Sequence, residues 1–180
     1  MNIFVLHEDP VQAAQYQCDK HVVKMVLESA QMLSTAHRIL DGDNVIDESL
    51  YKIAHKGHPC TKWVMESVAN YQWLYDHFIG LCDEYTYRYG KTHLSDTKFR
   101  DILLYPPANI PIKDRTPFAL AMSAFPQFID HDDPVTSYRR YYGTKADNFS
   151  LVWTKRDYPP WYFREYTGCL LYTSPSPRDA

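Results

Sequence analysis

Glycine is scarce in this sequence, at six residues in 180. None of the six forms a Gly-rich phosphate-binding loop, a dinucleotide fingerprint or a Gly-x-Ser-x-Gly elbow, which argues against all three kinds of site. A basic excess is also missing, because the formal net charge is −3. A protein that binds nucleic acid nonspecifically is usually basic. Basic residues outnumber acidic ones only within residues 86–168, so a local basic face remains open.

Long hydrophobic runs are absent as well, and none approaches the ~20 residues that a membrane span needs. The opening segment, Met1 to Leu6, is apolar but has no basic region, so we expect no signal peptide. The four cysteines are then expected to be reduced thiols. Aromatic residues, by contrast, are abundant, which excludes a disordered chain. We expect one soluble, cytoplasmic, monomeric domain that needs no membrane and no cofactor.

The C-terminal run, residues 169–180, differs in character from the rest of the chain. It resembles the translation of a transposase-type sequencing adapter, which implies an environmental, metagenomic assembly. A natural Ser/Pro-rich end is the alternative, and either origin predicts poor order. We therefore expect a single helical domain over residues 1–168 and a non-native, disordered tail over residues 169–180.

Two long helices dominate the predicted fold. Residues 10–40 follow an Asp-Pro step, which is typical of a helix start, and their apolar residues recur at helical spacing. Residues 59–89 also begin with proline and end before a glycine. Shorter helices are predicted over residues 95–104 and from Asp133-Pro134 onward. We expect a mainly α, compact domain with a short N-terminal extended segment, two long antiparallel helices and a long irregular C-terminal part.

Three ionisable residues share one face of the first long helix. His21, Lys24 and Glu28 follow i, i+3, i+7 spacing, so their side chains stack on one side. An imidazole, an amine and a carboxylate in one patch can exchange protons and shift each other's pKa values. The alternative is a solvated helix face with a simple Lys24–Glu28 pair.

Metal-capable residues occur at short spacing in His55-x-x-His58-x-Cys60. No fourth ligand is evident, and Pro59 fits a helix start better than a ligand loop. We therefore expect no metal site. His58 is instead expected at the start of the second long helix, beside a polar cleft.

Two segments rich in aromatic and basic residues are candidates for nucleic-acid contact. Around Glu84 and Arg88, three tyrosines and Lys91 form a surface for bases and phosphates, unless the pair is a plain helix salt bridge over an aromatic core. Residues 153–162 form a lid, a base-stacking wedge or a patch that closes the core. This second segment includes Lys155, Trp161 and Tyr162.

The pattern CDKHVVKM.LE.AQ.LSTAHR, followed by HK.HP...W and CDEYTYRYGK.H, resembles a group of short proteins common in marine phages over residues 1–165. That likeness implies expression in a phage-infected bacterial cell and carries no function by itself.

The chain also resembles the pyrimidine dimer DNA glycosylase family. Residues 19–21 (Asp-Lys-His) lie where that family has an aromatic-Arg-Glu motif on its early helix, and His58-Pro59 matches the step that begins its long second helix. Residues 83–90 resemble the end of that helix, and residues 160–162 resemble the family's Trp-Tyr terminal segment. The resemblance implies a helical DNA repair enzyme that excises bases.

The chain departs from the family's pattern in three respects. His21 occupies the position of the family's catalytic Glu. The family's nucleophile in phage enzymes is the amine of residue 2 after removal of Met, whereas Met1 is usually kept before a residue such as Asn2. The overall charge is acidic.

The resemblance implies a DNA glycosylase with lyase activity, in which an amine of the N-terminus, Lys20 or Lys24 attacks C1′ and forms a Schiff base. Glu28 or His21 then protonates the sugar oxygen. Two alternatives stay open: another phage enzyme of nucleotide or nucleic-acid modification that uses His21, Glu28 and His58 for acid–base work, and a non-catalytic protein of host takeover. The predicted catalytic residues are His21, Lys24, Glu28 and His58, and the predicted DNA-binding residues are Lys20, Glu84, Arg88, Lys91, Arg139, Arg140, Lys155, Trp161 and Tyr162.

Overall fold

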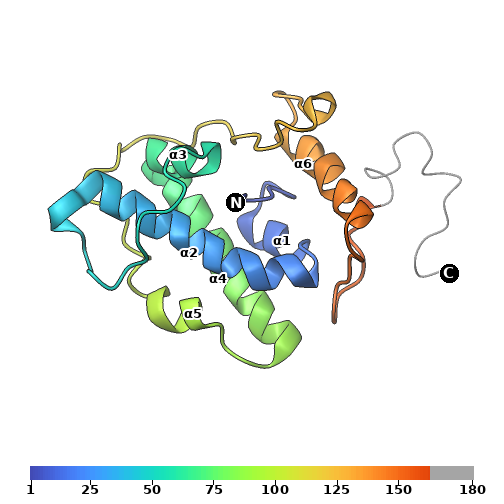
Figure 1. Cartoon of the computed structure of the whole chain (residues 1–180), viewed down its shortest axis with the longest axis horizontal. Coiled ribbons are helices and arrows are strands. Elements are labelled where there is room, and N and C mark those ends of the chain that lie inside the picture. Colours follow the sequence, from blue (N-terminus) through green and yellow to red (C-terminus); the bar gives the residue numbers. More distant parts are fainter. Residues whose placement is uncertain (163–180) are drawn as a thin grey trace, which may run out of the picture.

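Six α-helices build the part of the chain that the computed structural model describes, residues 1–162. No strand occurs within these residues, so the predicted mainly helical fold is confirmed (Figure 1). The predicted tail and residues 163–168 lie outside the described residues. The helices are α1 (Pro10–Gln15), α2 (Asp19–Asp41), α3 (Pro59–Glu66), α4 (Val68–Tyr89), α5 (Leu94–Phe99) and α6 (Pro134–Gly143), with 3-10 turns η1 (Gly42–Asn44), η2 (Pro126–Phe128) and η3 (Thr144–Asp147).

The two long helices, α2 and α4, run antiparallel and pack against each other, as predicted (Figure 1). Near the end of α2, His37 Nε2 lies 2.9 Å from the hydroxyl of Tyr71, near the start of α4. At the opposite end, Asp19 in the first turn of α2 pairs with Arg88 in the last turn of α4 at 3.0 Å. Gly80 lets α1 lie against α4, because a Cβ at this position would stand 3.1 Å from a side-chain carbon of α1.

The prediction of one continuous helix over residues 10–40 is wrong, because the chain turns between α1 and α2. At this turn Gln17 is buried, and its Nε2 donates to the Ile3 carbonyl and lies 3.1 Å from His77 Nε2. The Cys18 N–H donates to the Tyr142 hydroxyl at 2.8 Å. Contacts with distant segments therefore interrupt a helix that local spacing alone favours.

The second predicted helix, over residues 59–89, is also divided, at Ser67. Ser67 has an extended backbone, and its side chain accepts a hydrogen bond from the Asn70 N–H, which caps α4. The Val68 N–H donates to the Pro111 carbonyl. The helix predicted over residues 95–104 is observed as α5, which ends at Phe99, earlier than predicted.

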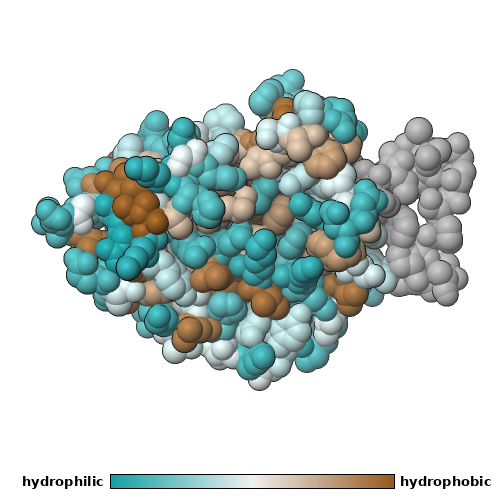
Figure 2. Space-filling view, in the orientation of Figure 1, coloured by the Kyte–Doolittle hydropathy of each residue, from teal (hydrophilic) through white to brown (hydrophobic). Residues whose placement is uncertain are grey.

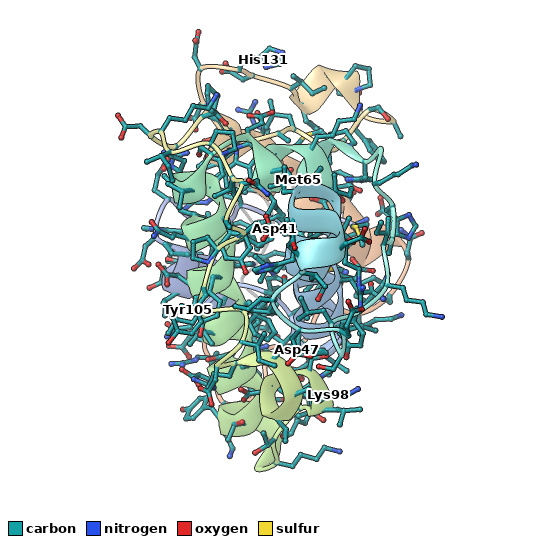
Figure 3. All side chains as sticks on the ribbon, turned by 90° about the vertical axis from the view of Figure 1, so that its left-hand side faces the viewer. Asp41, Asp47, Met65, Lys98, Tyr105 and His131 are labelled. Atoms are coloured by element: carbon teal, nitrogen blue, oxygen red, sulfur yellow. The ribbon has the colours of Figure 1, made fainter. Side chains whose placement is uncertain are left out.

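The N-terminal segment, predicted to be extended, has no regular secondary structure and turns at Phe4, and Ile3 to Leu6 are almost fully buried. The irregular part after α5 wraps around the helices and returns through α6. Asp41 anchors the first part of it at the end of α2 by accepting hydrogen bonds from the backbone amides of Ala108 and Asn109 (Figure 3). Among residues 1–162, no helix combines the length and the apolar character of a membrane span.

Candidate active site

The amino group of Met1 and two side chains of α2 meet at one place. The Met1 nitrogen lies 3.9 Å from Glu28 Oε2, and Lys24 Nζ lies 3.6 Å from Glu28 Oε1. The Glu28 side chain is 12 % exposed, and its Oε2 is buried without a hydrogen-bond partner among the described residues. One carboxylate therefore faces two amines, with an oxygen that no hydrogen bond occupies.

The anchoring of Met1 leaves part of its main chain exposed. The Met1 side chain is 2 % exposed, and its Sδ lies 3.6 Å from Thr61 Oγ1 of α3. The residue as a whole is half-buried, so its accessible part is the main chain that carries the amine. Asn2 is buried, and its Nδ2 donates to the Ala121 carbonyl at 3.0 Å. These contacts fix the position of the amine relative to Glu28.

Backbone strain marks both loop segments that lead to this place. Phe4 has a φ of 59° and His55 a φ of 47°, a left-handed conformation that costs a non-glycine residue about 1–2 kcal/mol. The Asn2 side chain closes the first turn by accepting hydrogen bonds from the N–H groups of Ile3 and Phe4. In the second turn the His58 N–H donates to the His55 carbonyl. Strain of this kind is concentrated at functional sites in proteins.

His58 begins α3 close to the amine and Glu28. Its Nδ1 accepts a hydrogen bond from the Cys60 N–H at 3.0 Å and caps the helix, so the neutral ring carries its proton on Nε2. Burial lowers the pKa of His58, and the positive N-terminal amine and His55 lower it further, against the opposing effect of Glu28. The ring is therefore a neutral hydrogen-bond donor at neutral pH.

His21 lies in the interior, two turns before Glu28 on α2. Its ring stacks on Phe4 with a centroid distance of 4.7 Å, and its Nδ1 lies 2.8 Å from the Tyr142 hydroxyl. Burial lowers the pKa of His21 to about 3, and the positive charges of Lys145, Lys24 and Lys20 act in the same direction. The imidazole is thus neutral at pH 7 and supports the turn of the N-terminal segment.

Glu84 and Arg88 lie inside the molecule. Arg88 donates to Glu84 Oε2 at 2.8 Å and to Asp19 Oδ1 at 3.0 Å, and its side chain is 0 % exposed. Arg156 donates to both carboxylate oxygens of Glu84 at 2.9 Å. Asp19 also accepts a hydrogen bond from the Thr154 N–H. This ionic network ties α2, α4 and the segment around Thr154 together and leaves no surface of Arg88 for a phosphate.

The other predicted basic residues differ in exposure. Lys20, Lys91, Arg140 and Lys155 are exposed, and Lys155 Nζ donates to a backbone carbonyl of α4. Arg139 is half-buried, and its Nε donates to a backbone carbonyl of the N-terminal segment. Of these basic residues only Lys20 lies on α2, where it precedes Lys24 and Glu28.

The aromatic end of the described chain closes the core. Trp161 and Tyr162 are buried, and the Trp161 ring packs edge-on against the rings of Tyr16 and Tyr142. Trp153 is also buried, and its Nε1 donates to the Tyr16 carbonyl. Of the three alternatives for this segment, the observed contacts correspond to core closure.

The His55, His58 and Cys60 group does not assemble a ligand set. His58 Nδ1 caps a helix, and burial raises the pKa of the Cys60 thiol to about 12, so the thiol keeps its proton. Residues 1–162 contain no group of three or more His, Cys, Asp or Glu side chains that could hold a metal ion.

The sequence patterns did not single out Lys145, which lies near the Phe4 ring of the N-terminal segment, or Asn2, which anchors that segment, as functional residues. Lys145 Nζ lies 3.2 Å from the Tyr141 hydroxyl and 5.7 Å from the centre of the Phe4 ring. More than a hundred residues separate Lys145 from Lys24, so no spacing rule connects them. Asn2 precedes the helices, where no periodic pattern exists.

Comparison with known proteins gives one match. A family model described as pyrimidine dimer DNA glycosylase matches residues 1–97, which include the N-terminal segment, Glu28 and His58. Searches of curated proteins and of solved structures found no match.

Proposed function

The chain belongs to the pyrimidine dimer DNA glycosylase family, and from this premise we propose that it is a base-excision enzyme with glycosylase and AP-lyase activity on damaged or modified bases in DNA. The observation that carries the proposal is the meeting of the Met1 α-amine with a nearly buried carboxylate at 3.9 Å. An amine next to a proton acceptor is the arrangement that Schiff-base chemistry requires.

In the proposed reaction Glu28 takes a proton from the ammonium group, and the neutral amine attacks C1′ of the target nucleotide. The new N–C1′ bond replaces the bond to the base, which leaves as an anion and takes up one proton from the C1′-bound nitrogen. Glu28 returns its proton to the sugar oxygen, the C1′–O4′ bond breaks with the help of the nitrogen lone pair, and an iminium forms between the amine nitrogen and C1′. Loss of a proton from C2′ then expels the 3′ phosphate and cleaves the strand.

Of the two amines beside Glu28, we assign the attack to Met1. The buried Met1 side chain restricts the position of its amine, whereas the Lys24 side chain is 60 % exposed. The assignment requires that Met1 carries a free amine in the working protein.

Glu28 takes the role that the family motif suggested for position 21. His21 and Glu28 share one face of α2, but the Met1 amine lies at Glu28, and the low pKa of His21 leaves it without a proton to donate at neutral pH. His58 contributes an Nε2–H donor to the leaving base. Lys91, Arg140 and Lys155 remain outer DNA contacts in this proposal, whereas Glu84 and Arg88 are structural.

Borohydride reduction tests the proposal, because it converts an iminium into a stable covalent adduct. The wild-type protein is expected to be trapped on duplex DNA that carries an abasic site and to cleave the strand. Glu28→Gln is expected to reduce both yields at least about a hundredfold, in the range typical of a lost acid–base group. Glu48→Gln, which changes an 81 % exposed carboxylate, is the matched control and should behave as wild type.

Absence of an adduct and of strand cleavage with the wild-type protein, on abasic DNA and on DNA with pyrimidine dimers, contradicts the proposed function. Equal activity of Glu28→Gln and the wild type contradicts the role of Glu28 while leaving the reaction class in place.

A further inference from the structure

Three lysines from two distant parts of the chain gather around one imidazole. Lys20 Nζ lies 4.3 Å from the centre of the Phe149 ring, and Phe149 packs edge-on against His21 at 5.6 Å. Lys145 Nζ lies 5.7 Å from the centre of the Phe4 ring, and this ring stacks on His21. Lys24 follows Lys20 by one turn of α2.

The positive charges of this group are poorly compensated. Among the described residues, neither Lys20 nor Lys145 lies within 4.0 Å of a carboxylate oxygen. Asp19, beside Lys20 in the sequence, is engaged by Arg88 and by Thr154, and Asp147, two residues after Lys145, forms no ion pair with Lys145 among the described residues. Glu28 is shared between Lys24 and the Met1 amine. A local excess of positive charge therefore persists in a chain whose net charge is −3.

Uncompensated like charges destabilise a folded protein, so their assembly on one face points to an anionic ligand. A helix advances about 6 Å over four residues, which is close to two phosphate steps of about 3.4 Å along one DNA strand. The aromatic rings beneath Lys20 and Lys145 restrict their motion, which lowers the entropy lost on binding. The face of the molecule in Figure 2 is mostly hydrophilic, with hydrophobic residues in separate small groups.

We infer that Lys20, Lys24 and Lys145, named here the lysine triad, form a contact surface for the phosphate backbone of duplex DNA beside the Met1–Glu28 site. The inference rests on the proposed function for the identity of the anion. It adds Lys145 to the residues that the sequence predicts to contact DNA. It also puts the contact with the DNA backbone on the same face as the Met1 amine.

Salt dependence of DNA binding tests the lysine triad without any chemistry. Each phosphate contact contributes about 0.9 to the slope of log K against log salt concentration. Fluorescence anisotropy with an undamaged 30-base-pair duplex, over a KCl series, is expected to show a shallower slope by about 0.9 for each of Lys20→Gln, Lys24→Gln and Lys145→Gln. The loss of affinity should be similar for duplexes of different sequence.

Lys113→Gln is the matched control, since it removes the same charge from an exposed lysine. Lys113 follows Pro111, which contacts the first turn of α4, whereas Lys20 follows Asp19, which pairs with Arg88 in the last turn of α4. An unchanged slope in all three triad variants, an equal change in Lys113→Gln, or no binding by the wild type overturns the inference.

The test separates the two proposals. Altered slopes in a protein that gives no borohydride adduct support the lysine triad and contradict the base-excision function. Unaltered slopes in a protein that is trapped on abasic DNA contradict the lysine triad alone.

Discussion

At the scale of single residues, two histidines near the site illustrate how position determines protonation. His58 is half-buried and caps α3 through Nδ1, which fixes its remaining proton on Nε2. His21 is 6 % exposed and enclosed by aromatic rings. Both have lowered pKa values, chiefly because burial disfavours the charged imidazolium.

Substitution of His58 separates its cap from its proposed chemistry. Asparagine also accepts the hydrogen bond of an N-cap, so His58→Asn should retain most of the stability, whereas His58→Ala should lose about 1 kcal/mol. Both variants lack the Nε2–H donor and should lose excision activity to a similar extent. Urea denaturation and a base-excision assay provide the two readouts. Full activity in His58→Asn would show that the ring is only a cap.

Acid should destabilise the folded protein through His21. A pKa of about 3 in the folded state, against an ordinary value of 6.5, makes protonation cost the folded state roughly 4–5 kcal/mol. The unfolded chain binds the proton first, so this stability is present above pH 6.5 and is lost as the pH falls from 6.5 towards 3.

His21→Phe keeps an aromatic ring between Phe4 and Phe149 and removes the titration. The melting temperature of the wild type should fall more steeply between pH 7 and pH 4 than that of the variant. Parallel curves for the two proteins contradict this assignment. His77, whose pKa burial lowers to about 4, contributes a background common to both.

At the scale of elements, the ionic network of Asp19, Glu84, Arg88 and Arg156 holds the ends of α2 and α4 together. Arg88 is fully buried and contacts two carboxylates and a backbone carbonyl. Arg88→Met should destabilise the protein by about 3–5 kcal/mol, because it removes a fully buried charge partner from Glu84 and Asp19 and leaves them only Arg156 and Thr154. The change in the free energy of unfolding is measured by urea denaturation.

Arg100 supplies the control for this prediction. It also pairs with two carboxylates, Asp83 and Asp96, but its side chain is 38 % exposed. Arg100→Met should therefore cost less than about 1 kcal/mol. Similar losses in the two variants would argue that burial does not determine the strength of the Arg88 contacts.

The helix boundaries show which parts of the fold could be predicted from the sequence. The starts of α1, α3 and α6 were predictable, since Asp-Pro and His-Pro steps cap and begin helices locally. The breaks after Gln15 and at Ser67 were not, because distant groups such as Tyr142 and Pro111 create them. Within the site, i, i+4 spacing predicts that Lys24 and Glu28 lie together, whereas the approach of Met1 and Lys145 depends on the tertiary fold.

At the scale of the whole molecule, an acidic protein is proposed to present a positive face to DNA. The N-terminus lies in the middle of the fold, and its amine is 3.9 Å from Glu28 of α2 (Figure 1). The ionic network around Arg88 and the packing of the aromatic end at Trp161 stabilise this arrangement. The central claim is that the Met1 amine, beside Glu28, forms the covalent bond to DNA.

Tryptic mapping of the borohydride-reduced adduct tests that claim most directly. Attachment at the Met1 amine is expected to place the sugar remnant on the peptide of residues 1–20, with normal cleavage after Lys20 and Lys24. Attachment at Lys24 would instead block cleavage there and modify a peptide of residues 21–38. A remnant on the Met1 amine, within the peptide of residues 1–20, is the predicted result, and a remnant on Lys24 or on any other lysine contradicts it.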